Sequence, residues 1–152
     1  MQGYLDDPDL TDESFENGWF KTGDTGFLDR QNLLYIRGRI KNLIILSNGE
    51  NVSPEELEFY IMKLPLVKEV LVYEYMCGIC AEIFVDKEYK ALNTITDPFK
   101  DLQQNILQIN RSLPTYKHIK KIIIRDQEFE KTSSNKIKRE INTKEPKEYA
   151  TV

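Results

Sequence analysis

Asp24 belongs to the run Gly23-Asp24-Thr25-Gly26, which is typical of a tight turn, where a carboxylate could act on a ligand. A carboxylate has two oxygens, and both can accept hydrogen bonds from the neighbouring hydroxyl groups of a ribose. Aspartate is also common in turns because its side chain bonds to the local backbone. The turn therefore predicts either a ribose-binding carboxylate or an aspartate that only shapes the backbone.

A second segment, Tyr35–Glu58, combines an arginine, a glycine turn and several acidic residues. The planar guanidinium of Arg39 offers donors that suit phosphate or ribose oxygens. Gly49, within the turn Ser47–Glu50, would let the backbone approach a ligand closely. Taken alone, the same residues also fit a surface arginine and a hairpin glycine.

Lys136 lies in a third segment, the polar run Thr132–Arg139. A lysine in a flexible polar loop can reach into a cleft and neutralise the negative charge that develops during phosphoryl transfer. The alternative is a surface lysine in a basic chain end, since residues 111–152 hold eleven basic and six acidic residues, a net charge of +5. Such a chain end could attract an anionic substrate or simply be solvated.

Turn-forming residues and apolar runs predict the backbone elements that hold Asp24, Arg39 and Gly49. The acidic stretch 9–15 suggests a short helical turn capped by Thr11. The polar residues 29–32 separate two short apolar runs, residues 26–28 and 33–36, as in a β-hairpin. The run Lys41–Leu46 is strand-like and leads into the turn that contains Gly49.

The rest of the chain predicts helices packed on a small sheet. A helix begins at Pro54 after a cap at Asn51 or Ser53, stops at Pro65, and has an apolar face made of Leu57, Ile61 and Leu64. Three strands are expected at residues 67–75, 79–85 and 119–124. A second helix, from Pro98 to about Leu113, precedes the third strand. This order predicts an α+β fold, a small mixed β-sheet with packed helices.

The order and spacing of the three chemical segments resemble the closing third of the adenylate-forming superfamily. This superfamily includes acyl-CoA synthetases, adenylation domains of peptide synthetases and luciferase-like ligases. The resemblance runs from about Met1 to Arg139 and includes Gly3-Tyr4-Leu5 and Gly18-Trp19. The run Lys41–Gly49 is most similar to long-chain fatty-acid CoA ligases, so the resemblance implies an AMP-forming acyl-CoA ligase that acts on a fatty acid.

The resemblance implies a role for each matched residue. Asp24 would bind the ribose hydroxyls of ATP and of the acyl-adenylate. Arg39 would assist at the ribose or the phosphates, and Ile36 would lie near the nucleotide. Lys136 would be the catalytic lysine, which bridges the substrate carboxylate and ATP during adenylation and then swings away. Lys41 would be the hinge of a domain rotation, and the CoA channel would be faced by Ser47, Asn48, Gly49 and Glu50.

Two positions depart from the family pattern. The residue before the catalytic lysine is usually glycine, and here it is Asn135. Asparagine tolerates left-handed backbone better than most residues, so we expect the loop to keep its shape. Ile45 stands where some luciferase-like members carry a second lysine, so that lysine's assistance to the later half-reaction is not expected here.

The resemblance also implies a domain division and a set of partners. Residues 1–40 would be a terminal strip of a large N-terminal domain, residues 41–140 a C-terminal lid domain, and residues 141–152 a polar tail. ATP, a carboxylic acid and CoA would be the substrates, and Mg²⁺ is expected in the full-length enzyme, bound outside this chain. Because the family's phosphate loop lies upstream of the matched region, we expect a piece of a longer or split enzyme that is inactive without its N-terminal domain.

Composition and charge argue against some classes of protein. Apolar residues make up 40% and charged residues 30% of the 152 residues, as in a soluble globular protein. No apolar run approaches the ~18–20 residues of a membrane span. We therefore expect a cytoplasmic protein, with peripheral membrane association left open. The net charge of −4 argues against nucleic-acid binding.

Cys77 and Cys80 form a lone CxxC pair, which could be redox-active or half of a zinc site. Two cysteines cannot make a disulfide framework, and the single histidine, His118, is far away in the sequence. We expect no metal site and interpret the pair as small residues in a hairpin.

Two other functions remain open at this stage. An adenylation domain could pass an acyl or aminoacyl group to a carrier protein, although no carrier-protein serine motif follows residue 140. A non-catalytic binding or regulatory module that has lost the chemistry is the other candidate. A phosphate loop encoded upstream would favour the enzyme, and its absence would favour the module.

Overall fold

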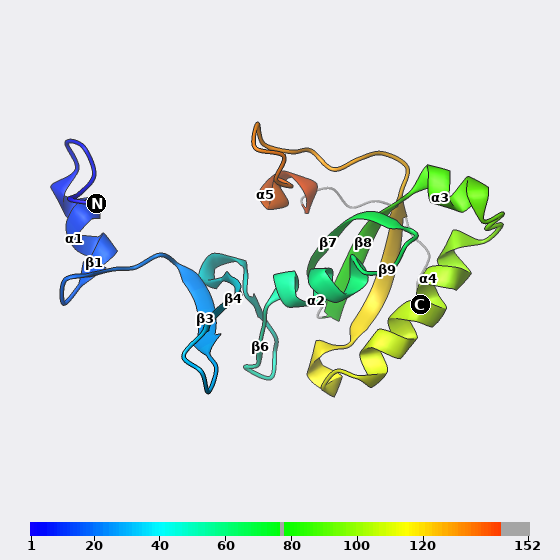
Figure 1. Ribbon diagram of the computed structural model, residues 1–152, viewed down its shortest axis with the longest axis horizontal. Helices are drawn as coiled ribbons and strands as arrows, with labels where there is room; N and C mark the ends of the chain where they lie inside the picture. Colours follow the sequence, from blue (N-terminus) through cyan, green and yellow to red (C-terminus); the bar gives the residue numbers. More distant parts are fainter. Residues whose placement is uncertain (77, 144–152) are drawn as a thin grey trace. The chain divides into compact units, whose positions relative to one another are not determined.

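The computed structural model describes residues 1–76 and 78–143, excluding the side chains of residues 141 and 142. The chain forms two compact units that meet in the sequence between Asn42 and Leu43. The second unit carries the main sheet and helices, which are shown in Figure 1. Within the described residues, no helix has the length and apolar character needed to cross a membrane.

The first unit begins with α1 (Pro8–Ser14), where a short helical turn is predicted. Its cap is Asp7, whose carboxylate accepts the backbone N–H of Leu10 at 2.9 Å, so the prediction of Thr11 as the cap is wrong. Thr11 instead donates its hydroxyl to the Asp7 carbonyl. A tight hairpin follows, in which β1 (Phe15–Glu16) pairs with β2 (Trp19–Phe20).

The predicted hairpin is present as β3 (Asp24–Leu28), which pairs in antiparallel fashion with β4 (Leu34–Arg39). The register shifts between Thr25 and Gly26, which indicates a β-bulge. A Cβ atom at Gly26 would lie 2.6 Å from the carbonyl oxygen of Tyr35, so only glycine allows the two backbones to approach this closely. Of residues 1–42, all of which the structure describes, only Gly38 is buried.

The strand predicted over Lys41–Leu46 is much shorter than expected. Residues Ile40–Asn42 form the 3-10 turn η1, and β5 covers only Ile44–Ile45, paired with β6 (Asn51–Val52). Two backbone bonds explain the difference. The Ile40 N–H donates to the Gly23 carbonyl in the first unit, and the Leu46 N–H donates to the Glu50 carbonyl, which closes the turn directly after β5.

The second unit is built on a three-stranded sheet in the order β7–β8–β9. The strands are β7 (Val67–Tyr75), β8 (Gly78–Val85) and β9 (Ile119–Arg125), which confirms the three predicted strands. β7 and β8 are antiparallel, whereas β8 and β9 are parallel. The connection between the parallel strands contains the helices α3 (Lys87–Leu92) and α4 (Pro98–Arg111) and the 3-10 turn η2 (Thr115–Lys117).

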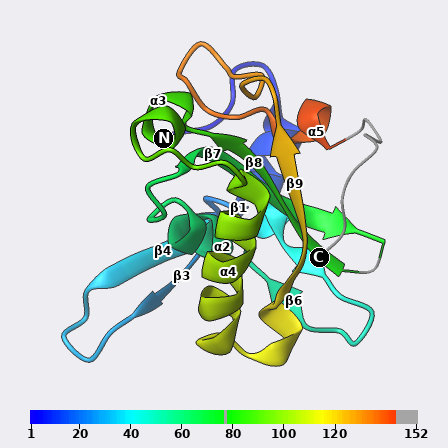
Figure 2. The same ribbon diagram turned by 90° about the vertical axis from the view of Figure 1, so that its right-hand side faces the viewer.

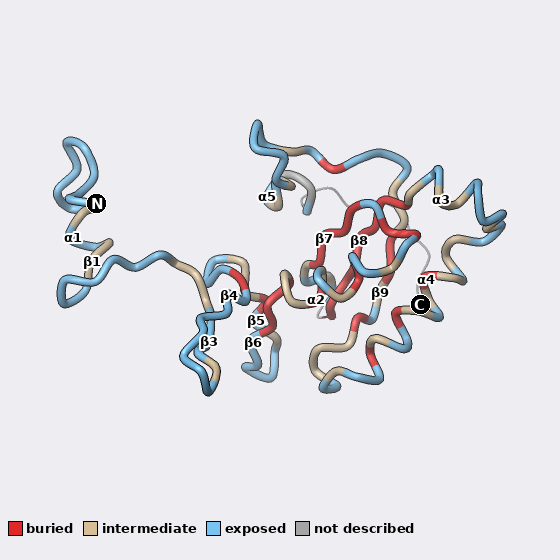
Figure 3. Tube along the Cα trace, viewed as in Figure 1, coloured by how far each residue is buried: buried red, intermediate tan, exposed pale blue. Residues whose placement is uncertain are grey.

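The helix α2 (Pro54–Ile61) and α4 cover one face of this sheet, as Figure 2 shows from the side. Both helices are predicted, but α2 ends before Pro65 and α4 ends before Leu113. The apolar stripes lie where the helical spacing places them, and Leu57, Ile61, Leu102 and Ile106 are at most 2% exposed. Figure 3 shows this core as the buried stretch of the trace.

The opposite face of the sheet is covered by the segment between β9 and α5 (Arg139–Asn142). A smaller apolar cluster forms there, with Phe129 packed against Leu71 and Phe84 and with Tyr73 and Ile137 at its margin. The sequence predicts only a polar loop from Lys131 onward. Because Phe129 and Ile137 are apolar and lie on opposite sides of that loop, they fasten both of its ends to the sheet.

Candidate functional site

Asp24 and Arg39 are brought together by the β3–β4 hairpin. They are cross-strand partners, and the Arg39 Nε lies 3.2 Å from the Asp24 Oδ1. The Asp24 side chain is 29% exposed and that of Arg39 is 67% exposed, so both can meet a ligand. The register therefore places one acceptor and one cation side by side, which is a suitable arrangement for a hydroxyl-bearing anion such as a nucleotide.

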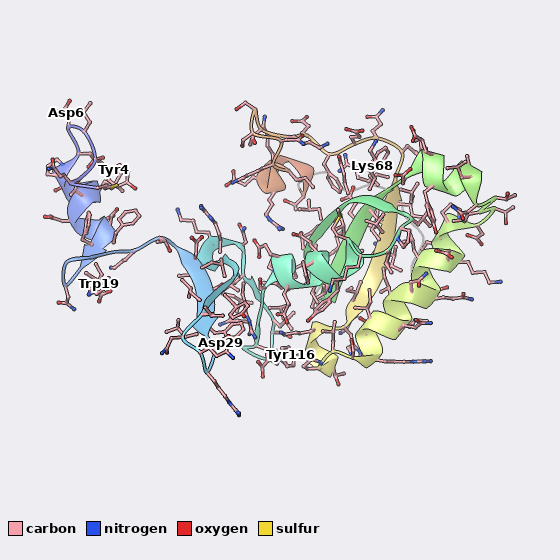
Figure 4. The ribbon with its side chains drawn as sticks, viewed as in Figure 1. Tyr4, Asp6, Trp19, Asp29, Lys68 and Tyr116 are labelled. Carbon is pink, nitrogen blue, oxygen red and sulfur yellow. The ribbon has the colours of Figure 1, made fainter. Side chains whose placement is uncertain are left out.

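Ile36 lies on the same hairpin, opposite Gly26 in the register, and is 61% exposed. Its neighbour Tyr35 stacks on Phe27, with ring centroids 5.2 Å apart. Trp19, labelled in Figure 4, is 81% exposed on the preceding hairpin. The first unit thus exposes apolar and aromatic side chains on both of its hairpins.

Lys41 is the central residue of the 3-10 turn η1, which is the last element before the boundary at Asn42 and Leu43. A short turn between two compact units concentrates the backbone freedom of the chain at few residues. The location suits a hinge.

The turn from Ser47 to Glu50 is rigidly closed. Gly49 adopts a positive φ of 82°, and its N–H donates to the Leu46 carbonyl at 2.8 Å. The Asn48 side chain accepts the N–H of Glu50 at 3.1 Å. The turn borders a pocket of about 140 Å³ whose other walls come from β8, η2 and β9. The lining residues are Leu46, Ser47, Asn48, Gly78, Ile79, Tyr116, His118 and Lys120.

Lys136 is exposed in a hairpin-like loop whose base is a bridge between Lys131 and Ile137. Within the loop, the Thr132 N–H donates to the Lys136 carbonyl at 2.8 Å, and the Thr132 hydroxyl accepts the Lys136 N–H at 3.2 Å. Asn135 adopts a φ of 62°, which confirms the expectation that asparagine supports left-handed backbone before the lysine. The loop therefore holds the backbone of Lys136 while its side chain extends into solvent.

The segment that enters this loop is tied to β7 by Glu69, a buried acid. One Glu69 oxygen accepts the Phe129 N–H at 2.9 Å, and the other forms an ion pair with Lys131. Hydrogen bonds to Glu69 and Glu128 raise the pKa of Lys131, which keeps it charged. The sequence gives no sign of this contact because residues 69 and 129 are distant in the chain.

Beneath the same segment lies a buried polar network on β7, β8 and β9. The Tyr73 hydroxyl donates to a Glu82 oxygen at 3.0 Å, and the other oxygen lies 3.2 Å from an Arg125 nitrogen. The guanidinium of Arg125 sits 4.0 Å from the centre of the Phe129 ring. The segment that leads into the Lys136 loop is thus supported by packed and charged groups.

Cys80 is completely buried, and burial raises the pKa of its thiol to about 11. A raised pKa lowers the fraction of reactive thiolate. Cys77, the other cysteine of the CxxC pair, lies outside the described residues. Where the structure describes the chain, no three histidine, cysteine, aspartate or glutamate side chains are grouped to hold a metal ion. The imidazole Nε2 of His118 lies 3.1 Å from the Leu113 carbonyl oxygen.

Within the second unit, the Ser47–Glu50 turn and the Lys136 loop lie on different sides. Figures 1 and 2 both show the turn between β5 and β6 at one end of the unit and the segment before α5 at the other. The predicted residues Asp24, Ile36, Arg39 and Lys41 belong to the first unit.

Sequence comparison shows the family of this chain. A family described as the AMP-binding enzyme C-terminal domain matches residues 41–149, which is more than half of the chain. The chain belongs to the AMP-binding enzyme family. It is similar to the 2-succinylbenzoate–CoA ligase of Listeria monocytogenes, with 40% identity over 140 residues that cover 90% of this chain and 28% of the ligase.

Two further relatives are also CoA ligases or synthetases. The long-chain-fatty-acid–CoA ligase of Escherichia coli is 37% identical over 142 residues, which cover 91% of this chain and 24% of the ligase. The structure of the Bacillus subtilis o-succinylbenzoate CoA synthetase with its acyl-adenylate OSB-AMP superimposes with a TM-score of 0.77. Its identity is 28%, and the match covers 99% of this chain and 29% of that one. The chain thus spans less than a third of these relatives' length.

Proposed function

We propose that this chain supplies the ribose-binding strip and the mobile lid of an AMP-forming acyl-CoA ligase. The observation that carries the proposal is the cross-strand pair of Asp24 and Arg39, followed by an exposed lysine on a braced loop in a unit of this family. Residues 1–40 would belong to the large domain, residues 41–140 would form the lid, and residues 141–152 would be a tail. The domain upstream would supply the remainder of the ATP site.

The first half-reaction joins the acid to AMP. An oxygen of the substrate carboxylate bonds to the α-phosphorus of ATP, the bond from that phosphorus to the bridging oxygen breaks, and pyrophosphate leaves with the electron pair. This step brings two anions together, so it needs a cation close to both. Lys136 is the residue we assign to this role, while Asp24 holds the ribose hydroxyls and Arg39 assists at the ribose or phosphates. Ile36 would contact the nucleotide.

The second half-reaction transfers the acyl group to CoA. The thiol gives up its proton, the sulfur bonds to the acyl carbon, and the bond from that carbon to the AMP oxygen breaks as AMP leaves. Lys136 would have to withdraw so that the turn Ser47–Glu50 reaches the thiol. A rotation at Lys41 would move Lys136 away from the reacting groups and bring the Ser47–Glu50 turn toward them. The location of the turn and the lysine loop on different sides of one unit supports this proposal.

ATP and CoA would therefore be substrates. Mg²⁺ would neutralise the phosphates of ATP and would be held by the large domain. The acid is proposed to be a fatty acid, supported by the resemblance of Lys41–Gly49 to long-chain ligases and by the 37% identity to the Escherichia coli enzyme. The 40% identity to the Listeria enzyme favours 2-succinylbenzoate as the second candidate acid.

The large domain is the partner that the first unit requires. The apolar side chains of the first unit lie mostly in solvent. Among them are Leu28, Leu34 and Ile36, each more than 60% exposed. Such a surface is more apolar than a stable isolated domain presents. We infer that the upstream domain covers it.

Pyrophosphate exchange tests the proposal directly. The chain alone should catalyse no ATP–pyrophosphate exchange with any acid, because the phosphate loop is not among its residues. The polypeptide that carries the large domain together with this chain should catalyse exchange with a long-chain fatty acid. Exchange with 2-succinylbenzoate in its place would assign the second acid, and exchange by the chain alone would contradict the proposed division of the enzyme.

The pocket beside the Ser47–Glu50 turn leads to a prediction for CoA. Lys120 lines this pocket and is exposed, so its ammonium could meet a phosphate of CoA. We expect Lys120→Ala to raise the KM for CoA about fivefold, the equivalent of about 1 kcal/mol for one exposed charge contact. Pyrophosphate exchange should be unchanged.

The matched control is Lys121→Ala. Lys121 follows Lys120 on β9, so its side chain points to the other face, where it lies 4.0 Å from the centre of the Tyr75 ring. This control should leave the KM for CoA unaltered. An equal rise in both variants would mean that the basic strand attracts CoA through its general charge and not through the pocket.

A further inference from the structure

Glu58 on α2 binds the segment that leaves the Lys136 loop. One of its oxygens lies 2.5 Å from a terminal nitrogen of Arg139, and the other accepts the Val72 N–H at 2.7 Å. The second terminal nitrogen of Arg139 donates to the Val72 carbonyl at 3.2 Å. Glu58, Arg139 and the two backbone groups of Val72 therefore close a ring of hydrogen bonds.

This ring closes an open edge of the sheet. β7 is an outer strand, so the backbone groups of Val72 that face away from β8 need partners from elsewhere. The side chain of Glu58 is 15% exposed and that of Arg139 is 25% exposed, so the pair is largely withdrawn from water. Burial raises the pKa of Glu58, whereas the charge of Arg139 lowers it. Removing one partner of an ion pair that is withdrawn from water is strongly destabilising.

The ring of hydrogen bonds lies close to Lys136 in the chain. Arg139 is three residues beyond Lys136, and Ile137 between them packs against the cluster of Leu71, Phe84 and Phe129. On the entering side, Lys131 is held by Glu69. Each stem of the loop is thus anchored by acids: Glu69 from β7 holds Lys131, while Glu58, with Glu55 3.6 Å away as a second partner, holds Arg139 from α2. Few backbone rotations remain between these anchors and Lys136.

We propose that Glu58 is a positioning residue that, through Arg139, sets where Lys136 lies during adenylation. This inference rests on the proposed function of Lys136. Since β6 and then α2 follow the Ser47–Glu50 turn, the ion pair also connects the loop that carries the lysine to the helix that comes after this turn. Glu58 has no role in the thioester step itself, since Lys136 is withdrawn there.

The test compares Glu58→Gln with Glu56→Gln. Glu56 lies on the same helix and forms an ion pair of similar burial, 2.7 Å from Lys117, that does not touch the lysine loop. In the polypeptide that carries the large domain, Glu58→Gln should slow adenylation at least about tenfold, because misplacing a catalytic group by about 1 Å can cost a hundredfold. Thioester formation from supplied acyl-adenylate should stay within about twofold of wild type. Glu56→Gln should leave both rates unchanged.

A second readout uses the chain itself. Amide hydrogen exchange over residues 131–138 should be faster in Glu58→Gln than in Glu56→Gln, because only the first variant loosens the loop. If Glu58→Gln is too unstable to assay, Arg139→Lys serves instead. It keeps the charge but loses the planar donor set that bridges Glu58 and Val72, so it should show the same selective loss of adenylation.

The outcomes separate this inference from the proposed function. Equal losses in both half-reactions, or adenylation as fast as in Glu56→Gln, would overturn the positioning role of Glu58. If Lys136→Ala also left adenylation intact, the proposed role of the lysine itself would fail. If Lys136→Ala lost adenylation while Glu58→Gln did not, only the positioning inference would be wrong.

Discussion

Replacement of Lys136 by alanine is expected to abolish adenylate formation and to spare the thioester step. In the polypeptide that carries the large domain, pyrophosphate exchange should fall at least about a hundredfold, as when one group that stabilises transition-state charge is removed. Thioester formation from supplied acyl-adenylate and CoA should stay within about twofold, because that step does not bring the carboxylate and ATP together. The two rates are measured separately.

The matched control for this variant is Lys138→Ala. Lys138 belongs to the same loop, and its backbone N–H donates to the Glu130 carbonyl at 2.9 Å, a bond that alanine retains. We expect this control to leave adenylation nearly unchanged. A loss of the same size in both variants would show that the loop acts through its overall positive charge, and an equal loss of both half-reactions in Lys136→Ala would remove its specific role.

The apolar spacing predicts the core of the second unit well. Leu57 and Ile61 on α2, and Leu102 and Ile106 on α4, are buried as their helical positions indicate. The β-branched runs of the three strands are equally clear, because both faces of the sheet are covered and the central strand β8 is buried along its whole length. These features depend on residues that are close in the sequence, so local patterns carry the information.

Such local patterns fail where one sequence pattern is compatible with two kinds of secondary structure. The run Lys41–Leu46 ends in four apolar residues, two of them β-branched, yet only Ile44 and Ile45 form a strand. A short apolar run does not distinguish a strand from other buried backbone. The helix α3 was not predicted either, although Asp86 caps it by accepting the Tyr89 N–H. Its six residues are too few for an amphipathic period to become visible.

The support of the Lys136 loop could not be predicted from the sequence. Glu58 follows Glu55 and Glu56, so its charge suggests favourable electrostatics at the start of a helix. The fifth position of α2 is beyond the first turn, however, and there Glu58 meets Arg139, a residue 81 positions later. A contact between residues so far apart in the sequence produces no local sequence pattern. The only available sign is that the acidic run continues past the helix start.

The residues of the candidate site therefore differ in how well the sequence predicts their roles. Asp24, Arg39 and Lys136 are recognisable because their chemistry is tied to short motifs. The residues that hold the Lys136 loop, Glu69 and Glu58, are ordinary acids in the sequence and acquire a role only through the fold. Catalysis by positioning depends on both, since a cation misplaced by about 1 Å loses much of its effect.

A proline at position 41 is expected to block the exchange between the two half-reactions. Lys41 lies in the 3-10 turn beside the boundary of the two units. Proline fixes φ near about −65° and disfavours helical backbone at Ile40, so this turn could no longer absorb a domain rotation. Overall acyl-CoA formation should fall at least about tenfold, whereas one half-reaction, measured separately, should stay within about threefold of wild type.

Lys41→Ala is the control, because it removes the charge and leaves both backbone torsions free. It should support overall acyl-CoA formation at nearly the wild-type rate. If Lys41→Pro turned over as fast as Lys41→Ala, the rotation would have to be absorbed elsewhere and Lys41 would not be the hinge. If Lys41→Ala were as defective as Lys41→Pro, the ammonium group would carry the effect. Only the combination of a defective proline variant and an active alanine variant supports a backbone hinge between the two units.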